Sequence, residues 1–489
     1  MAFKSPFRAS SIPSNYEPSG EDTRSEGALN ATGTTRWIDA GTWVAWTQLG
    51  PIKLAMIPAH IAHYVLPLIV AISIVLMLAR PRGITEAWWI SGGALLLIVL
   101  RLVPLKLAGQ AVAKGSDVYL FLIGMMLLSE LAREQGVFDW VASVAVRGAN
   151  GSCSRLFLLV YGAGTLVTIF MSNDATAVVL TPAILTAVRK AKVSPLPYLF
   201  VCALIANAAS FVLPISNPAN LVVFHTGMPP LGTWLADFGV PSLLSILATF
   251  LVMRILFRRE LCNSIECQVD KAELSANGKL VLAGLALMIA VLLTASAMKK
   301  DLGLPTCLAA LVITAVVSIK ARSNLAKLAR EISWATLLLV AGLFVMVDAV
   351  ESQGALNLTQ QWLAWASSLG QNAGAMVVGF AVGLGNNLVN NLPLGLIAGG
   401  TIQAAHTKGL MANAVLIGVD LGPNLSVTGS LATILWLLAL RNDPGAGAGG
   451  ERLDVSFWKF LKVGAVAMPV ALFAALCGAI LMQMLVGQH

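Results

Sequence analysis

The chain has 489 residues, of which 57% are hydrophobic and only 11% are charged, and its formal net charge is +8. A soluble domain carries about 25% charged residues, so this composition excludes an ordinary soluble domain. The apolar stretches are numerous and long, which also excludes a protein held by a single membrane anchor. The sequence therefore predicts a polytopic membrane protein surrounded mostly by lipid.

Residues 1–55 differ from the rest, because they are rich in Ser, Gly, Pro, Asn and charge. This composition predicts a mostly disordered polar tail. The tail has neither the short apolar core nor the small-residue cleavage site of a signal peptide. An extra weak span over residues 38–55 is an alternative interpretation of its last part.

A helix needs about 20 apolar residues to cross a bilayer. Ten segments meet this requirement: 56–80, 85–104, 116–134, 197–225, 238–257, 279–298, 303–320, 334–350, 411–440 and 461–486. All of them are read as helices, so the predicted fold class is all-α.

Two further apolar stretches, 154–190 and 373–402, are each divided by a polar tip. The first tip is Ser172-Asn173-Asp174, and the second is Gly385-Asn386-Asn387 followed by Asn390-Asn391. Each arm has about 13–16 residues, which is short for a full span and typical of a re-entrant hairpin.

Two of the ten long segments are also interrupted. Segment 197–225 contains Pro214-Ile215-Ser216-Asn217-Pro218, and segment 411–440 contains a polar run from Gly422 to Gly429 that includes Pro423. Proline removes a backbone donor and clashes with the preceding turn, so both helices should break there.

These features recur in the same order at nearly one spacing. Glu130 corresponds to Asp348 at an offset of 218, Asn173-Asp174 to Asn386-Asn387 at 213, and the two breaks to each other at 212. Each half then holds five spans and one hairpin. Because five is odd and a hairpin returns to its own side, the sequence predicts two inverted repeats whose broken helices meet at the midplane. The predicted boundaries are 56–258 and 279–489 for the repeats, with a cytoplasmic linker at 259–278.

The basic residues predict the orientation. If residue 56 starts outside, 21 of the 32 Lys and Arg residues lie in cytoplasmic segments, six lie in external segments and five lie in the tail. Cytoplasmic loops carry an excess of Lys and Arg, so this orientation is favoured. The first hairpin then opens from the cytoplasm and the second from outside.

Four polar elements, two hairpin tips and two breaks, are predicted to converge. Broken backbone is tolerated in a bilayer only against protein or a water-filled cavity, and half-helix ends point free N–H or C=O groups there. The predicted substrate-binding residues are Asn173, Asp174, Ser216, Asn217, Asn386, Asn387, Asn390, Asn424, Thr428 and Ser430. The alternative is that Asn173, Asp174 and Ser216 only cap half-helices.

Asp174 and Asp420 are the predicted proton-coupling residues. Each is the only acid over a long apolar region and each sits at a polar break. Intramembrane acids are usually functional, and burial favours the neutral form of a carboxyl, so either can carry a proton. The alternative is a permanently paired structural carboxylate. For Glu130 and Asp348 an interfacial structural role is favoured.

No enzyme motif is found. The chain has no H-E-x-x-H, G-x-S-x-G or Walker lysine motif, and its six cysteines show no zinc spacing. A membrane-embedded enzyme would need a nucleophile–base pair or metal ligands within the spans, so it is disfavoured. Neither a cofactor nor a nucleic-acid partner is predicted.

The second half resembles a known family. Residues 386–393, Asn-Asn-Leu-Val-Asn-Asn-Leu-Pro, are similar to the hairpin signature of the arsenical pump membrane proteins (arsenite permeases). Asp420-Leu421-Gly422-Pro423 followed by the run from Thr428 to Thr433 strengthens the likeness. The resemblance extends from about residue 60 to 486, and its first-half motifs are shared across a wider ion transporter superfamily.

The resemblance implies efflux of arsenite and antimonite from the bacterial cytoplasm across the inner membrane in exchange for protons. Some members of the family pair with a cytoplasmic ATPase subunit, for which the loop 258–279 is the natural docking candidate. A thiolate cage would hold arsenic too tightly for rapid release, so transport should not need the cysteines. The long N-terminal tail departs from the family pattern.

Two alternatives keep the fold and change the substrate: a sodium/proton antiporter and a carboxylate carrier. A carboxylate carrier needs groups that pair with anions, yet the four breaks carry Asp and neither Lys nor Arg. The sodium antiporter stays open, because Asn and Asp oxygens also suit Na⁺.

Overall fold

In the computed structural model, residues 59–225, 227–262, 273–322, 325–354, 356–441 and 455–486 are described, and every element within them is a helix. The predicted all-α class is therefore confirmed. The polar tail and residues 263–272 of the predicted linker at 259–278 lie outside the described residues.

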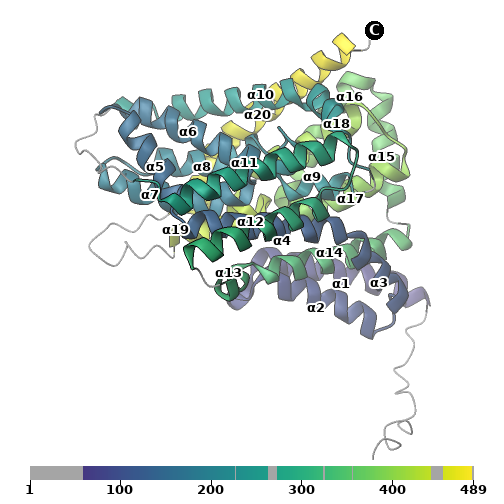
Figure 1. Cartoon of the computed structure of the whole chain (residues 1–489). Helices are drawn as coiled ribbons and strands as arrows, with labels where there is room; N and C mark the ends of the chain where they lie inside the picture. The colour runs from purple at the N-terminus through teal and green to yellow at the C-terminus, as the bar shows by residue number, and fades with distance from the viewer. Residues whose placement is uncertain are drawn as a thin grey trace, which may run out of the picture. The chain divides into compact units, whose positions relative to one another are not determined.

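The helices of the first half follow one another with short connections (Figure 1). They are α1 (Ala59–Ala79), α2 (Glu86–Val99), α3 (Leu105–Lys114), α4 (Ser116–Glu134), α5 (Val137–Gly148), α6 (Cys153–Phe170), α7 (Thr181–Lys190), α8 (Leu196–Ala208), α9 (Pro218–Val223) and α10 (Leu231–Leu256). Short helical turns join some of them: η2 (Pro81–Gly83), the π-helix η3 (Ala175–Leu180), η4 (Pro214–Ser216) and η5 (Glu260–Cys262).

The second half repeats this order. Its helices are α11 (Ala276–Ala297), α12 (Gly303–Ala321), α13 (Leu325–Glu331), α14 (Trp334–Ser352), α15 (Leu356–Ser368), α16 (Gln371–Val389), α17 (Asn391–Ala404), α18 (Leu410–Leu421), α19 (Leu431–Arg441) and α20 (Phe457–Val486). Two 3-10 turns, η6 (Gly422–Asn424) and η7 (Val427–Gly429), separate α18 from α19.

Packing repeats as well as order. Helix α4 packs on α12, and its counterpart α14 packs on α2. Helix α9 packs on α17, while α19 packs on α7 and η3. The last helices of the two halves, α10 and α20, pack on each other. Corresponding helices of the two halves therefore make corresponding contacts, and each of these contacts joins one half to the other.

Seven of the described helices are long and apolar enough to cross a membrane. An eighth span is formed if α3 and α4, which meet at a bend of 48°, are counted together. The ten expected segments all appear as helices, but some are shorter than a bilayer requires. Helix α2 has 14 residues, and segments 197–225 and 411–440 are each split into two half-helices.

Both expected breaks are present. Asn217 and Ser430, the residues just before α9 and α19, have extended backbone with φ of −147° and −144°. Pro218 then starts α9, where its missing N–H would have had no intrahelical partner. The prediction that proline-containing runs interrupt these two helices is therefore confirmed.

The two hairpins return to the side from which they enter. In the second hairpin, Gly374 near the start of α16 packs against the Ala366 carbonyl at the end of α15. Thr401 near the end of α17 shares a hydrogen bond of 2.7 Å with Thr359 at the start of α15. Both arms thus end on α15, which bridges the mouth of the hairpin. Helix α5 contacts both α6 and α7 in the same way.

The first arms are longer than expected. Helices α6 and α16 have 18 and 19 residues rather than the 13–16 expected, so each is long enough to cross a bilayer by length. Helix α6 fills the whole of the first expected arm, whereas α16 begins two residues before the expected stretch and continues through Gly385, Asn386 and Asn387 to Val389. Helix α6 starts at Cys153 after the Ser152 cap, and α16 starts at Gln371.

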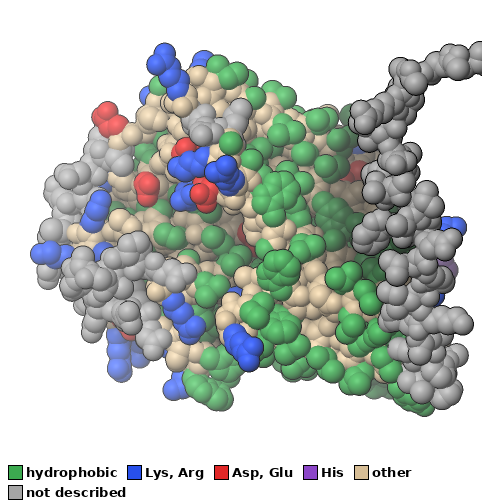
Figure 2. Space-filling view, turned by 90° about the horizontal axis from the view of Figure 1, so that it is seen from below, with side chains coloured by type: hydrophobic (Ala, Val, Ile, Leu, Met, Phe, Trp, Pro, Cys, Tyr) green, Lys and Arg blue, Asp and Glu red, His purple; other side chains and the backbone are tan. Residues whose placement is uncertain are grey.

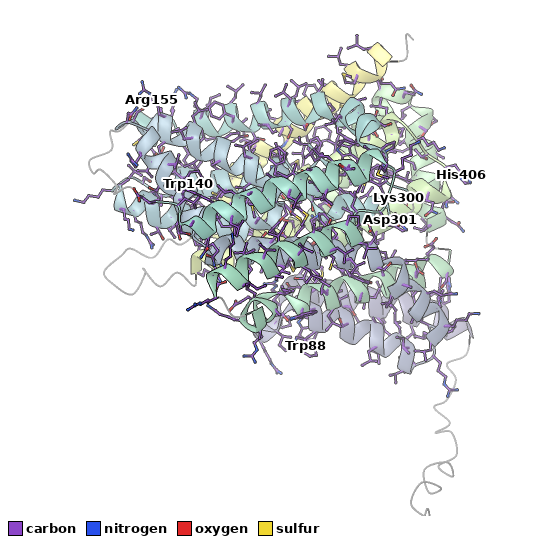
Figure 3. All side chains as sticks on the ribbon, viewed as in Figure 1. Trp88, Trp140, Arg155, Lys300, Asp301 and His406 are labelled. Carbon is purple, nitrogen blue, oxygen red and sulfur yellow. The ribbon has the colours of Figure 1, made fainter. Side chains whose placement is uncertain are left out.

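Corresponding helices lie at opposite ends of the bundle. Figure 1 places α5 and α7 at the left end and α15 and α17 toward the right end. Figure 3 likewise shows Arg155 at the left end and Lys300 and His406 at the right end. On the face drawn in Figure 2, most visible Lys and Arg side chains lie toward the left, while hydrophobic side chains cover much of the middle and right.

Candidate substrate and coupling site

The two helix breaks contact each other through buried amides. Asn217 Nδ2 donates to Asp420 Oδ1 at 2.7 Å. Asn207 Nδ2 donates to Asn424 Oδ1 at 2.9 Å, and Asn424 Nδ2 donates to the Leu204 carbonyl at 3.0 Å. All four side chains are nearly inaccessible to solvent. The structure thus joins residues of the two halves that lie more than 200 positions apart in the sequence.

The second hairpin tip binds the second break. Asn387 Nδ2 donates to the Gly422 carbonyl at 3.1 Å, and Asn387 Oδ1 accepts from Ser426 Oγ at 2.6 Å. Asn390 Nδ2 donates to the Thr428 carbonyl at 3.3 Å, and Thr428 Oγ1 donates to the Asn387 carbonyl at 3.3 Å. These contacts hold the tip against η6 and η7.

Asn386 is fixed in the same region. Its Nδ2 donates to the carbonyls of Gly418 at 2.9 Å and Val419 at 2.7 Å. Because a carbonyl only accepts, these two bonds set which end of the amide is Nδ2. Asn386 Oδ1 is then left buried with no hydrogen-bond partner among the described residues.

The first hairpin tip meets the first break less extensively. Ser216 Oγ donates to the Ile169 carbonyl at 2.9 Å, which ties the break to the end of α6. Asn173 is 2% exposed, and its Oδ1 has no hydrogen-bond partner in the described part of the chain. Asn173 therefore shares with its counterpart Asn386 a buried acceptor that has no hydrogen-bond partner among the described residues.

The half-helices are capped by residues other than Asn173, Asp174 and Ser216, which the sequence offered as possible caps. Asn217 accepts from the Ala219 N–H, Asn390 from the Leu392 N–H and Ser430 from the Thr433 N–H. At the first tip, Ser172 accepts from the Ala175 N–H. Asn173 and Asp174 cap no half-helix within the described structure, and Ser216 accepts from the Leu213 N–H at 3.3 Å within the turn η4 rather than capping α9.

The two candidate proton carriers lie in different surroundings. Asp420 is fully buried; its Oδ1 accepts from Asn217, and its Oδ2 has no partner by geometry among the described residues, although the Ser210 hydroxyl lies beside the carboxyl. A buried polar atom without a partner is costly and calls for an explanation. A bound proton or a donating substrate would satisfy it.

Asp174 instead lines a cavity of about 140 Å³, which we call the Asp174 cavity. Pro218 and Leu431, the first residues of the two half-helices α9 and α19, line it too. Within the described residues, no side chain forms a hydrogen bond or ion pair with the Asp174 carboxyl. The cavity also contains Glu130 and Glu331, and none of the residues that line it is Lys, Arg or His.

Some polar residues of this region were not expected. Asn207, Ser210, Asn220 and Ser426 are buried and hydrogen-bonded around the breaks. Asn207 stands 213 positions before Asp420, the same offset that relates Asn173 to Asn386. The expected offset of 212 for the breaks would have paired Asn207 with Val419; the structure shows an offset of 213 there, from Asn217 to Ser430, and this offset pairs Asn207 with Asp420.

Within the described residues, no group of three or more His, Cys, Asp or Glu is placed to hold a metal ion. Cys153, Cys202, Cys307 and Cys477 are free, and Cys202 is fully buried next to Thr181 rather than in a cavity. The polar atoms available to a substrate near the breaks are therefore oxygens and nitrogens.

Comparison with known proteins identifies the class. The sequence profile of the family CitMHS, described as citrate transporter, matches residues 69–418. An arsenical pump membrane protein of Escherichia coli is 25% identical over 425 residues, which cover 83% of this chain and 95% of that protein. An uncharacterised transporter of Mycobacterium tuberculosis is 25% identical over 381 residues, with 73% and 84% covered.

A solved structure is similar in fold. The YdaH transporter of Alcanivorax borkumensis superposes with a TM-score of 0.54 at 15% sequence identity, and the match covers 79% of this chain and 89% of that one. The helices, the breaks and the family match, which spans more than half of the chain, lead to one conclusion. The chain belongs to the CitMHS citrate transporter family and is a multi-pass membrane transporter.

Proposed function

We propose that this transporter exports arsenite and antimonite from the bacterial cytoplasm across the inner membrane, in exchange for protons, by alternating access. The observation that carries the proposal is a set of buried acceptors without partners in the described structure: Asn173 Oδ1, Asn386 Oδ1 and Asp420 Oδ2. Such atoms call for a ligand that donates hydrogen bonds. Arsenite near neutral pH is an uncharged trihydroxide, and its three hydroxyls are donors.

The same atoms disfavour a carboxylate substrate. A carboxylate only accepts hydrogen bonds, and an anion needs cationic partners when it leaves water. The Asp174 cavity has no cationic side chain among the residues that line it, and it contains three carboxyls. The family description names citrate, so citrate is the necessary control substrate. The relatives named arsenical pump membrane protein favour the metalloid.

Sodium is the second candidate. Amide and carboxylate oxygens coordinate hard cations, and the unpartnered acceptors near the breaks are all oxygens. A sodium/proton antiporter would use Asp174 and Asp420 in the same positions. Salt sensitivity against arsenite sensitivity of a deletion strain separates the two functions.

The decisive experiment is uptake into everted membrane vesicles with and without a proton gradient. We expect gradient-driven uptake of arsenite, competition by antimonite, and little uptake of citrate or Na⁺. Uptake of citrate or Na⁺ in place of arsenite would contradict the proposal.

Two variants test the proton carriers. Asp174→Asn and Asp420→Asn keep the side-chain shape and an acceptor oxygen but remove the titrating carboxyl. The coupling residue should lose gradient-driven accumulation while arsenite exchange between the two sides continues. Gradient-driven uptake that survives in both single variants would show that neither residue carries the coupling proton.

A further inference from the structure

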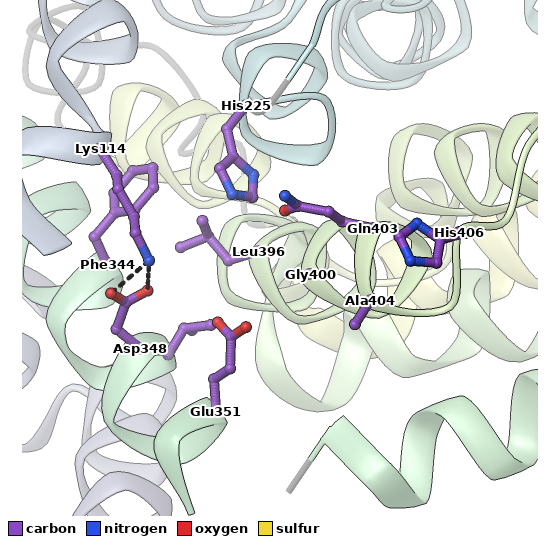
Figure 4. Close-up of a pocket in the computed structure, with 11 residues that line it drawn as sticks. Lys114, His225, Phe344, Asp348, Glu351, Leu396, Gly400, Gln403, Ala404 and His406 are labelled. Carbon is purple, nitrogen blue, oxygen red and sulfur yellow. Dashed lines mark hydrogen bonds and ion pairs between the residues drawn. The ribbon is translucent and has the colours of Figure 1, made fainter. Parts of the chain in front are cut away.

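A second and larger hollow lies away from the residues described above. It has a volume of about 450 Å³ and is formed by α3, the end of α9, α14 and α17. Figure 4 shows His225 above the middle of this hollow, the pair Lys114 and Asp348 on one side and His406 on the other. We call it the His225 cavity. The count of basic residues predicts that it opens outside.

The His225 ring has one nitrogen available for a proton. Its Nδ1 lies 2.9 Å from the Val222 carbonyl oxygen. A carbonyl only accepts hydrogen bonds, so Nδ1 carries the hydrogen in the neutral ring and Nε2 keeps its lone pair. The ring stands edge-on to Phe344 of α14, with centroids 6.1 Å apart. His225 therefore presents a ring nitrogen that can accept a proton between α9 and α14.

Charged groups face this ring from the helices around it. Lys114 Nζ donates to both Asp348 oxygens, at 2.9 and 2.7 Å, so these two charges are matched. Glu351, one turn further along α14, has no side-chain hydrogen bond or ion pair among the described residues, and its carboxylate projects toward the hollow in Figure 4. Lys114, Asp348 and Glu351 are all close enough to act electrostatically on the ring.

His225 is linked to the coupling site through one short helix. Helix α9 has six residues and is about 9 Å long. Its cap, Asn217, donates to Asp420, and His225 follows its last turn. The other side of α9 is held by α17, because a Cβ at Gly399 would lie 2.5 Å from the Val223 carbonyl oxygen. Helix α9 thus connects His225 to both Asn217 and the second hairpin.

We propose that His225 is a further proton-binding site of the transporter. A proton from the solvent on this side adds to Nε2 and converts the imidazole to an imidazolium ring. The imidazolium then donates to the unpaired Glu351 carboxylate, which draws α9 and α17 toward α14. This inference rests on the proposed exchange of substrate for protons, because His225 would bind the proton on the second side of the membrane.

Proton binding is measured first without transport. The chain has five histidines, so replacing His60, His63, His406 and His489 with Gln leaves His225 alone. Diethyl pyrocarbonate modifies only the neutral ring, and its rate against pH gives the titration midpoint of His225. We expect Glu351→Gln to lower the midpoint by about one unit and Lys114→Gln to raise it. The double variant Lys114→Gln, Asp348→Asn removes two opposite charges that are paired with each other. Its titration midpoint for His225 should therefore stay near that of the parent protein.

Transport is measured second, with the pH of the His225 side varied in oriented vesicles. His225→Gln should lose most of the dependence of arsenite exchange on that pH. Glu351→Gln should shift this pH dependence to lower pH, the same direction in which it shifts the titration midpoint of His225. His406→Gln, across the same cavity, should behave as the wild type. The inference is overturned if Glu351→Gln leaves the titration midpoint of His225 unchanged, or if His225→Gln leaves the pH profile of exchange unchanged. A wild type that does not move arsenite overturns the proposed function instead, and the titration still decides the proton site.

Discussion

Asn217 performs two tasks at one position. Its Oδ1 caps α9, and its Nδ2 binds the buried Asp420 carboxyl. Ser430, its counterpart in the second half, caps α19 and shares a hydrogen bond with Thr433, and in the described part of the chain it bonds to no carboxyl. The two residues therefore form a matched pair in which only one supports a candidate proton carrier.

We expect Asn217→Ala to destabilise the protein more than Ser430→Ala. Loss of a cap costs about 1 kcal/mol. Leaving the buried Asp420 without its donor adds about 1–3 kcal/mol. Thermal unfolding in detergent measures the difference, and arsenite exchange measures the function. Equal losses of stability would show that the bond between Asn217 and Asp420 contributes little.

The cysteines supply another residue-level prediction. Cys202 is fully buried against Thr181 and lines none of the cavities described above. Because its thiol cannot reach a bound metalloid without rearrangement, a Cys202→Ser variant and a variant without any cysteine should retain most arsenite uptake. Loss of uptake in a stable, correctly inserted Cys202→Ser protein would point to thiol ligation.

The sequence predicts which residues belong to the site better than it predicts which residues they contact. The polar tips and breaks stand out because Asn, Ser and Asp are rare within apolar segments. The bond between Asn217 and Asp420 joins residues 203 positions apart, so it depends on how the two breaks pack. For the same reason, a sequence window cannot distinguish the accessible Asp174 from the enclosed Asp420.

At the scale of elements, the contact between α9 and α17 brings the backbones of the two halves close together near the site. Gly399 lies against the Val223 backbone, and a Cβ there would stand 2.5 Å from the carbonyl oxygen and 3.0 Å from Cα. At the next residue, Gly400, a Cβ would meet only Leu356 Cδ1, at 3.4 Å. Alanine at either position gives the same change in helix propensity, but only at Gly399 does its Cβ meet the backbone of α9.

Gly399→Ala should push α17 away from α9 and reduce transport. Overpacking of a close contact costs about 1–3 kcal/mol. Gly400→Ala carries the same gain in helix propensity without that contact, so it should keep wild-type activity and be at least as stable as the wild type. Uptake rates and unfolding temperatures of the two variants give the comparison. Wild-type activity in Gly399→Ala would mean that α9 and α17 are free to separate.

The elements that sequence reasoning missed share one property. Helices α3, α5, α13 and α15 have 7–13 residues, and three of them, α3, α5 and α13, carry charged side chains. A search for long apolar windows passes over such helices. Two of them matter for the hairpins, because α5 and α15 bridge the hairpin mouths. Amphipathic spacing, rather than mean hydropathy, is the signal that identifies them.

At the scale of the molecule, the two cavities occupy corresponding places in the two halves. Met126, Ser129 and Glu130 of α4 line the Asp174 cavity, and Phe344, Val347 and Asp348 of α14, each 218 positions later, line the His225 cavity. The central charges are not symmetric: Asp174 corresponds to Asn387, and Asp420 to Asn207. A symmetric scaffold thus carries an asymmetric set of acids.

The inverted arrangement predicts that the two cavities open on opposite sides of the membrane. Lys106 on α3 and Arg330 on α13 are exposed and belong to corresponding helices. In a cysteine-free background, Lys106→Cys should react with a membrane-impermeant maleimide in intact spheroplasts, whereas Arg330→Cys should react only in everted vesicles. The charge count requires this direction, because it places Lys106 outside. Labelling of both positions from the same side would refute the inverted repeat, and with it the assignment of the two cavities as opposite mouths.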